Sequence, residues 1–186
     1  MDPVDIGGHL EEVLIDSPTL QRRVGQLAEE IMAEHPDDDL LFVAVLKGAV
    51  IFIADLARAM SKSVEMDFMA VSSYGYGTQS SGVVRILKDL DRDISGKHVV
   101  LVEDVIDSGL TLSWLLKNLA ARNPASLEVC TLLRKRDALQ VDLDVKYVGF
   151  DIPNAFVVGY GLDYAERYRN LAVVATLSPD IFGPTT

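Results

Sequence analysis

The chain has few of the features that mark extracellular, nucleic-acid-binding or membrane proteins. A single cysteine, Cys130, excludes an internal disulfide and suits a reducing compartment. Acidic residues outnumber basic ones by 28 to 17, and the net charge of −11 argues against a general attraction to nucleic acid or to an anionic membrane. The sequence has no signal-peptide-like start and no apolar run of membrane-spanning length. We therefore expect a cytoplasmic protein with no nucleic-acid partner and no membrane partner.

What the chain does have is enough apolar sequence for one buried core, since 49% of its 186 residues are hydrophobic. Apolar runs alternate with helical patterns up to about residue 133, which predicts an α/β fold with a mainly parallel, twisted sheet flanked by helices. The remainder is more irregular, as in a small subdomain. The expected strands are Glu11–Ile15, Leu40–Leu46, Val64–Tyr74, Val83–Leu87, a strand from His98, Ser126–Leu133, Val145–Phe150, Phe156–Gly159 and Leu171–Thr176. The expected helices begin after Asp16 or Ser17, at Val50 and after Thr111.

One stretch organises the chain: the apolar strand from His98, which ends in Glu103 and Asp104. Adjacent residues of a strand point to opposite sides, so these two carboxylates should diverge. They therefore suit ribose hydroxyls and a hydrated Mg²⁺ better than a shared proton. Ligands of open α/β sheets bind at this carboxyl edge.

The loop that follows the strand, residues 107–111, leads directly into a helix. Its backbone amides can converge on a phosphate, assisted by the helix dipole. Gly109 permits close approach, and Ser108 and Thr111 add hydroxyl donors. The pattern therefore indicates a site for a phosphorylated sugar. It is equally compatible with a plain strand end whose aspartate caps the helix, or with the acidic pair of a receiver domain.

Val100–Thr111 (VLVEDVIDSGLT) resembles the phosphoribosyl-pyrophosphate signature of type I phosphoribosyltransferases. The resemblance covers about residues 10–178. More narrowly, the chain resembles the bacterial members of this family that act on hypoxanthine and guanine. Four further segments carry it: Leu46-Lys47-Gly48-Ala49, Ser72-Ser73-Tyr74-Gly75, Leu133-Arg134-Lys135-Arg136 and Val148–Arg169. It implies the type I phosphoribosyltransferase fold as a single domain over residues 1–186, with a core at about 36–135 and a small hood from about 1–20 and 136–186.

The resemblance also implies an activity and its site. The activity is Mg²⁺-dependent transfer of the 5-phosphoribosyl group of phosphoribosyl pyrophosphate to N9 of hypoxanthine or guanine, giving IMP or GMP and pyrophosphate. The residues implied for the sugar phosphate and pyrophosphate are Lys47, Gly48, Glu103, Asp104, Asp107, Ser108, Gly109, Leu110, Thr111 and Arg169. Those implied for the purine are Lys135, Phe156, Val157 and Asp163. The implied metal ligands are Glu103, Asp104 and Asp163.

Individual roles follow from the same resemblance. Asp107 is the expected catalytic base for the purine N7 proton. Lys135 is expected to donate a hydrogen bond to the 6-oxo group of the purine. It should reject a 6-amino group, because that group and the lysine ammonium are both hydrogen-bond donors. Ser73 and Tyr74 resemble the start of a mobile loop that covers the reacting centre. A cis peptide bond is implied before Lys47, and a homodimer or homotetramer is expected.

Two alternative functions are open, and the chain departs from the family pattern at two positions. The same fold could serve a regulator that senses phosphoribosyl pyrophosphate without turnover, although such proteins usually need a nucleic-acid-binding surface. A receiver domain needs a lysine on a later strand, and no lysine follows Lys146. Some relatives carry Lys where Leu110 stands and Ser where Ala49 stands. The histidines His9, His35 and His98 share no metal-ligand spacing, and we assign them no role.

Overall fold

A computed structural model of the chain describes residues 8–74 and 83–182. The glycine- and serine-rich part of the expected loop, residues 75–82, lies outside the described residues, and so do the side chains of Ser73 and Tyr74. None of the helices in the described ranges is long and apolar enough to cross a membrane.

The main sheet has six strands in the order β4-β3-β2-β5-β6-β7. Only β4 runs antiparallel to its neighbour β3, and the other pairs are parallel, which confirms the expected mainly parallel α/β sheet. The strands are β2 (Leu40–Leu46), β3 (Glu65–Tyr74), β4 (Val83–Lys88), β5 (His98–Ile106), β6 (Ser126–Arg134) and β7 (Tyr147–Asp151). Most of the expected strand ends are right to within two residues.

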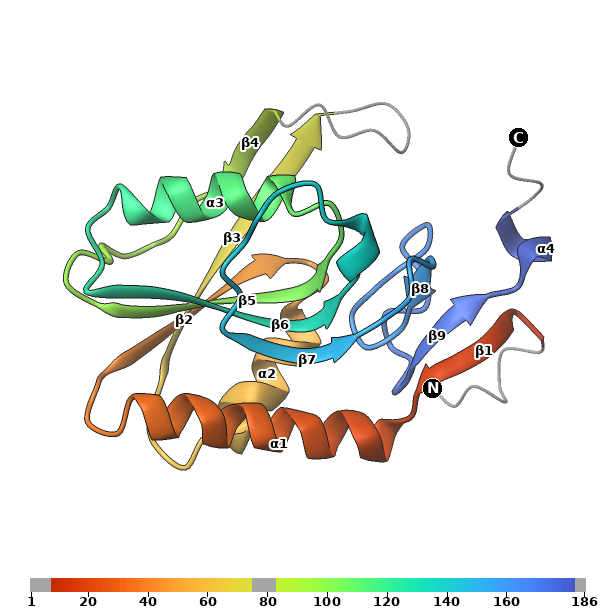
Figure 1. Ribbon diagram of the computed structural model, residues 1–186, viewed down its shortest axis with the longest axis horizontal. Helices are drawn as coiled ribbons and strands as arrows, with labels where there is room; N and C mark the ends of the chain where they lie inside the picture. The colour runs from red at the N-terminus through yellow and green to blue at the C-terminus, as the bar shows by residue number, and fades with distance from the viewer. Residues whose placement is uncertain (1–7, 75–82, 183–186) are drawn as a thin grey trace.

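Two layers of helices cover this sheet. Helices α1 (Ser17–Glu34) and α2 (Val50–Ala59) pack on one face, and α3 (Leu110–Ala120) packs on the other (Figure 1). Of the two candidates for the start of α1, the structure selects Asp16, whose Oδ1 accepts a hydrogen bond of 2.9 Å from the Thr19 amide.

The continuous apolar run of β2 follows from this two-sided burial. Leu40, Phe42 and Ala44 belong to the core under α1 and α2, whereas Leu41 and Val43 belong to the core under α3. A strand covered on both faces needs apolar residues at every position. Each fully buried large side chain contributes about 1.5–3 kcal/mol to folding, so the strands at the centre of the sheet form its most stable part.

The hood is a separate antiparallel sheet in the order β1-β9-β8, beside the main sheet (Figure 1). Its strands are β1 (Leu10–Ile15), β8 (Val157–Val158) and β9 (Val174–Leu177), and the short helix α4 (Pro179–Phe182) follows β9. A second short helix, η2 (Arg136–Ala138), lies between β6 and β7 of the main sheet. A small core of its own includes Val158, Leu171 and Ala175. The expected hood boundaries differ from this arrangement, because β7 belongs to the main sheet and α1 packs against it.

Candidate active site

The candidate site lies at the carboxyl edge of the main sheet, where β5 ends in the middle of the strand order. Parallel pairing with β2 and β6 brings the ends of these strands to the same edge. The backbone continues the pairing past the strands, since the Lys135 amide donates to the Ile106 carbonyl at 2.9 Å. Two hollows open here, and Val105 and Asp107 line both of them.

The first hollow, about 170 Å³, surrounds the loop between β5 and α3. Gly109 is the residue that precedes the helix, and its φ of +78° is a left-handed conformation that favours glycine. The N-cap residue Gly109 has no side chain to cap α3, and the Leu110 amide donates only a long bond of 3.4 Å to Ser108 Oγ, so the first amides of the helix stay available to an anion. The alternative in which Asp107 caps this helix is therefore wrong. The predicted residues in this hollow are Glu103, Asp107, Ser108, Gly109 and Thr111.

The second hollow, about 300 Å³, lies between the main sheet and the hood. Segments far apart in sequence meet in it. The predicted residues that line it are Lys47, Gly48, Asp104, Asp107, Lys135, Phe156, Val157, Asp163 and Arg169. Glu103 and Asp104 thus line different hollows, as expected for neighbours on a strand.

Asp107 and Lys135 form an ion pair where the two hollows meet. The Lys135 Nζ donates to Asp107 Oδ2 at 2.9 Å; the lysine side chain is buried, whereas that of Asp107 is exposed. An ammonium and a carboxylate side by side present a donor and an acceptor to one ligand.

The turn after β2 packs tightly against Asp104. The Leu46–Lys47 peptide bond is cis, as the resemblance implied. A Cβ on Gly48 would lie 1.6 Å from Asp104 Oδ2, and a Cβ on Gly161 would lie 2.0 Å from the Gly48 carbonyl oxygen. The absence of side chains at both positions lets the hood, the turn and the acidic strand end come together.

Arg169 joins the carboxylates of the hood to this turn. Its Nη2 lies 2.8 Å from Asp163 Oδ1 and 3.4 Å from Glu166 Oε1, and the other Glu166 oxygen lies 3.0 Å from Lys47 Nζ. The Nε of Arg169 is buried and has no hydrogen-bond partner among the described residues. A buried N–H of this kind favours an anion in the adjoining hollow. Sequence reasoning missed Glu166, although it lies within the matched segment Val148–Arg169.

Burial perturbs the two strand-end carboxylates. It raises the pKa of Glu103 well above its usual value, and the charge of Asp104 raises it further. Burial also raises the pKa of Asp104 to about 6, against the opposing effects of the Val105 amide and Arg169. A bound cation would stabilise the charged forms of these two carboxyls.

The predicted metal ligands divide between the hollows. Asp104 and Asp163 line the second hollow and Glu103 the first, so the three do not converge on one point. Mg²⁺ commonly takes only one or two carboxylates and completes its shell with water and substrate phosphate oxygens. The all-oxygen donors Asp104 and Asp163, next to the unpaired Nε of Arg169, fit such a metal–phosphate group.

The remaining predicted residues are placed as follows. Leu110 is the first residue of α3 and lines neither hollow. Ser73 and Tyr74 end β3, and their side chains lie outside the described residues. The apolar lining residues Val45, Leu112 and Leu162 were not expected, because apolar residues of a strand or helix carry no sequence signal of a site.

A sheet whose central strand carries two carboxylates near its end and leads into an amide-rich loop, with a hood beside that edge, defines the type I phosphoribosyltransferase class. The family model described as phosphoribosyl transferase domain matches residues 12–165. The chain is 59% identical over 181 residues to hypoxanthine-guanine phosphoribosyltransferase of Mycobacterium avium, covering 94% of this chain and 89% of that protein. It is 47% identical over 173 residues to the Bacillus subtilis (strain 168) protein of the same name, covering 93% and 96%.

A solved structure gives the same result. The crystal structure of a hypoxanthine phosphoribosyltransferase from Staphylococcus aureus superposes with a TM-score of 0.91 at 40% identity, covering 94% of this chain and 95% of that one. The chain belongs to the phosphoribosyltransferase family, in its hypoxanthine-guanine group.

Proposed function

We propose that the protein is a purine salvage enzyme. It transfers the 5-phosphoribosyl group of phosphoribosyl pyrophosphate to N9 of hypoxanthine or guanine and releases IMP or GMP and pyrophosphate. The observation that carries this proposal is the meeting of two hollows at Asp107, one lined by the phosphate loop and the other by Lys135, Phe156 and Val157. Similarity to named hypoxanthine-guanine phosphoribosyltransferases supports it.

The first hollow is proposed to hold the sugar phosphate. The amides of residues 108–111 and the hydroxyls of Ser108 and Thr111 would bind the 5′-phosphate at the start of α3. Glu103 and Asp104 would lie on either side of the ribose. Leu110 would contribute its backbone amide alone, so a side chain outside the hollow is compatible with its role.

The second hollow is proposed to hold the purine and the pyrophosphate. Phe156, a residue that is 48% exposed, would stack on the base, and the Val157 carbonyl would accept from its edge. Lys135 would donate to the 6-oxo group. On purine entry, the bond from Lys135 to Asp107 would be exchanged for bonds to the base.

In the reaction, the bond between ribose C1 and the pyrophosphate oxygen breaks, and the electron pair leaves with pyrophosphate. The lone pair of purine N9 forms the new bond to C1. The proton on N7 then passes to the Asp107 carboxylate, which restores a neutral base. Lys47, the Gly48 amide and Arg169 would bind the departing pyrophosphate. Asp104 and Asp163 would hold Mg²⁺, which would supply charge neutralisation for the leaving pyrophosphate.

The direct test is an assay of nucleotide formation with phosphoribosyl pyrophosphate and Mg²⁺, given hypoxanthine, guanine, xanthine or adenine separately. IMP and GMP should form and AMP should not, because a 6-amino group would face the Lys135 ammonium. Omission of Mg²⁺ should abolish turnover. Tight binding of phosphoribosyl pyrophosphate with no nucleotide from any base would instead favour the regulator without turnover.

Replacing Lys135 by alanine should raise KM for hypoxanthine and guanine by roughly 10- to 100-fold, because a hydrogen bond from a charged group contributes about 1.5–3 kcal/mol. Binding of phosphoribosyl pyrophosphate, measured by calorimetry, should change little. Arg136→Ala is the matched control, since this neighbouring side chain is exposed and pairs with Asp151 outside both hollows. Loss of sugar-phosphate binding in Lys135→Ala would show that the purine assignment is wrong.

Replacing Gly48 by alanine should lower kcat/KM by about 100-fold, the usual effect of displacing a catalytic group by about 1 Å. The new methyl group would overlap Asp104 Oδ2, so the turn or the carboxylate must move. Gly25→Ala in α1 is the control, because a Cβ there meets nothing within 4 Å. It should leave activity unchanged and stabilise the fold by about 0.5–1 kcal/mol. Equal activities of the two variants would contradict the proposed role of the turn.

We also propose a cytoplasmic homodimer or homotetramer, supported by family membership. Light scattering on the purified chain tests the assembly, and a monomer at micromolar concentration would contradict it. The role of Ser73 and Tyr74 in covering the site remains part of this proposal.

A further inference from the structure

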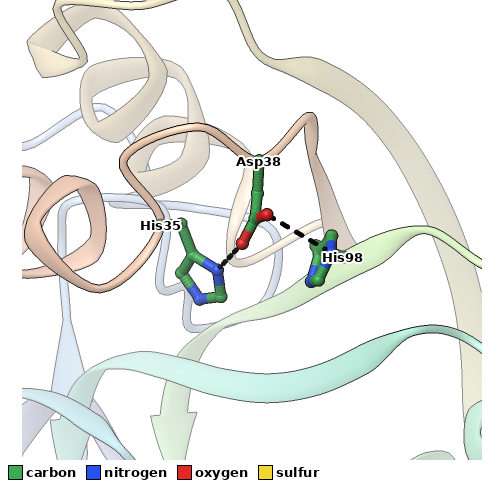
Figure 2. A group of neighbouring side chains, drawn as sticks. All are labelled: His35, Asp38 and His98. Atoms are coloured by element: carbon green, nitrogen blue, oxygen red, sulfur yellow. Dashed lines mark hydrogen bonds and ion pairs between the residues drawn. The ribbon is translucent and has the colours of Figure 1, made fainter.

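Three polar side chains converge at the opposite edge of the main sheet, where the strands begin (Figure 2). His35 follows α1, Asp38 precedes β2, and His98 is the first residue of β5. One ligand atom from each lies within 4.8 Å of the other two. Within residues 8–74 and 83–182, this is the only group of three or more histidine, cysteine or acidic side chains with that geometry.

The carboxylate of Asp38 lies between the two imidazoles and presents one oxygen to each. Its Oδ2 is 2.8 Å from His35 Nδ1, and its Oδ1 is 3.5 Å from His98 Nε2. The two ring centroids are 5.8 Å apart. Figure 2 shows the carboxylate pointing into the space that the rings flank. One nitrogen of each ring and the carboxylate therefore share a common centre.

The other nitrogen of each ring is held by an oxygen on β6. His35 Nε2 lies 2.8 Å from Glu128 Oε2, and His98 Nδ1 lies 2.9 Å from Ser126 Oγ. Glu128 is itself held, since Tyr147 donates to it at 3.0 Å and Lys146 at 2.8 Å. Metal-binding histidines characteristically donate their second ring N–H to such an oxygen, which fixes the tautomer and the ring orientation.

The backbone holds this geometry in place. Parallel pairing sets Leu40 opposite His98 and His98 opposite Ser126. The Lys62 Nζ donates to the carbonyls of both His35 and Asp38, so the connection from α1 to β2 is fixed at both residues. The arrangement is thus preorganised by elements distant in sequence.

We propose that His35 Nδ1, His98 Nε2 and the Asp38 carboxylate form a binding site for a divalent transition metal, with Zn²⁺ as the best fit. Two imidazoles and one carboxylate are a common zinc ligand set, whereas Mg²⁺ and Ca²⁺ take oxygen ligands. A water completes the tetrahedron, because the side chains of Asp38 and His98 are 35% and 33% exposed. The site joins the end of α1 to the start of β5 and stabilises the fold; it takes no part in phosphoribosyl transfer.

The surrounding charges set the conditions for binding. Lys62 and Lys146 bring positive charge, while Glu128 and the exposed Asp37 and Asp39 offset it. Burial works to lower the pKa of His35, but its hydrogen bonds to Glu128 and Asp38 outweigh burial and the pKa is raised. A metal ion replaces the proton on Nδ1 and releases it, so binding is measured at about pH 8, where proton competition is weaker.

The test is calorimetric titration of the chelator-treated, full-length protein with Zn²⁺, in excess Mg²⁺ to occupy the oxygen sites of the opposite edge. The wild-type chain should bind one Zn²⁺ per protomer. His98→Gln should weaken this site by more than about 100-fold, and Ser126→Ala by roughly 10- to 100-fold, as expected for loss of an outer partner. His9→Gln is the control: His9 contacts Tyr168 in the hood and should leave binding unchanged.

Two further readouts exclude an indirect effect of folding. Co²⁺ in place of Zn²⁺ should give the visible absorption of a tetrahedral site in the wild-type and His9→Gln proteins, and not in His98→Gln or Asp38→Asn. Zn²⁺ should raise the Tm of the first two proteins and not of the last two. Absence of the site from the wild-type chain, or a site that persists in both His98→Gln and Asp38→Asn, would overturn the proposal.

Discussion

Replacement of Asp107 by asparagine is expected to lower kcat by about 10²- to 10⁴-fold, the range typical for loss of a general base. The dissociation constant for phosphoribosyl pyrophosphate should stay within a few-fold of that of the wild-type protein. Asparagine has the same shape, and its Oδ1 can still accept from Lys135, so the geometry of the pair survives. What is lost is the charge that receives the N7 proton.

The measurement pairs stopped-flow or steady-state kinetics with calorimetric binding of phosphoribosyl pyrophosphate. Asp137→Asn is the control, since this exposed aspartate lies two residues beyond Lys135 and lines neither hollow. It should behave like the wild-type protein. An equal loss of turnover and sugar-phosphate binding in Asp107→Asn would rule out the base and leave Asp107 as a binding residue.

Replacement of Asp104 by asparagine should abolish Mg²⁺-dependent turnover and, at the same time, stabilise the metal-free protein at about pH 8. Burial raises the pKa of Asp104 to about 6 in the folded chain, against about 3.9 in an unfolded one. The folded state therefore binds the proton more tightly, and its stability falls as pH rises from about 4 through about 6. The amide of the Asp104→Asn variant would carry no such cost, and its side-chain oxygen can keep the 2.7 Å hydrogen bond from the Val105 amide.

The expected gain in the free energy of unfolding at pH 8 is about 1–2 kcal/mol, below the full linkage value of about 3 kcal/mol because Asp104 retains some solvent contact. This corresponds to about 2–4 °C in Tm per kcal/mol for a chain of this size. Below about pH 4 the difference should disappear, because the carboxyl is then protonated in both states. Asp163→Asn is the matched control: it should also lose activity, but breaking its 2.8 Å pair with Arg169 should bring no stabilisation. A gain independent of pH would contradict burial as the cause.

The main sheet could be predicted because its signals are local. A run such as Leu40–Leu46 is short and apolar at every position, which is typical of a strand covered on both faces. The phosphate loop was predictable for the same reason, since strand end, glycine and helix start are contiguous. The grouping of Lys47, Lys135 and Arg169 came from family resemblance and not from the pattern, because nothing local joins these residues.

The features that could not be predicted from the sequence depend on pairings between distant segments. Glu166 was missed because its contact with Lys47 spans 119 residues. The histidines were given no role because their spacing in the sequence is uninformative; it is the register of Leu40 with His98 that brings His35 and His98 together. The hood boundaries were misplaced because pairing of β7 with β6 is a tertiary preference that a short strand pattern does not encode.

The pairing of Ile15 with Val174 also sets an order of events during synthesis. The strands of the main sheet and the phosphate loop are all made before β9 leaves the ribosome, and they can fold as they emerge. Strand β1 is made first but cannot pair until β9 has been made. The part of the site on the main sheet should therefore form before the hood does. A nascent chain arrested before Val174 should therefore resist protease across the main sheet and be cleaved around β1, which arrest-and-digest experiments can measure.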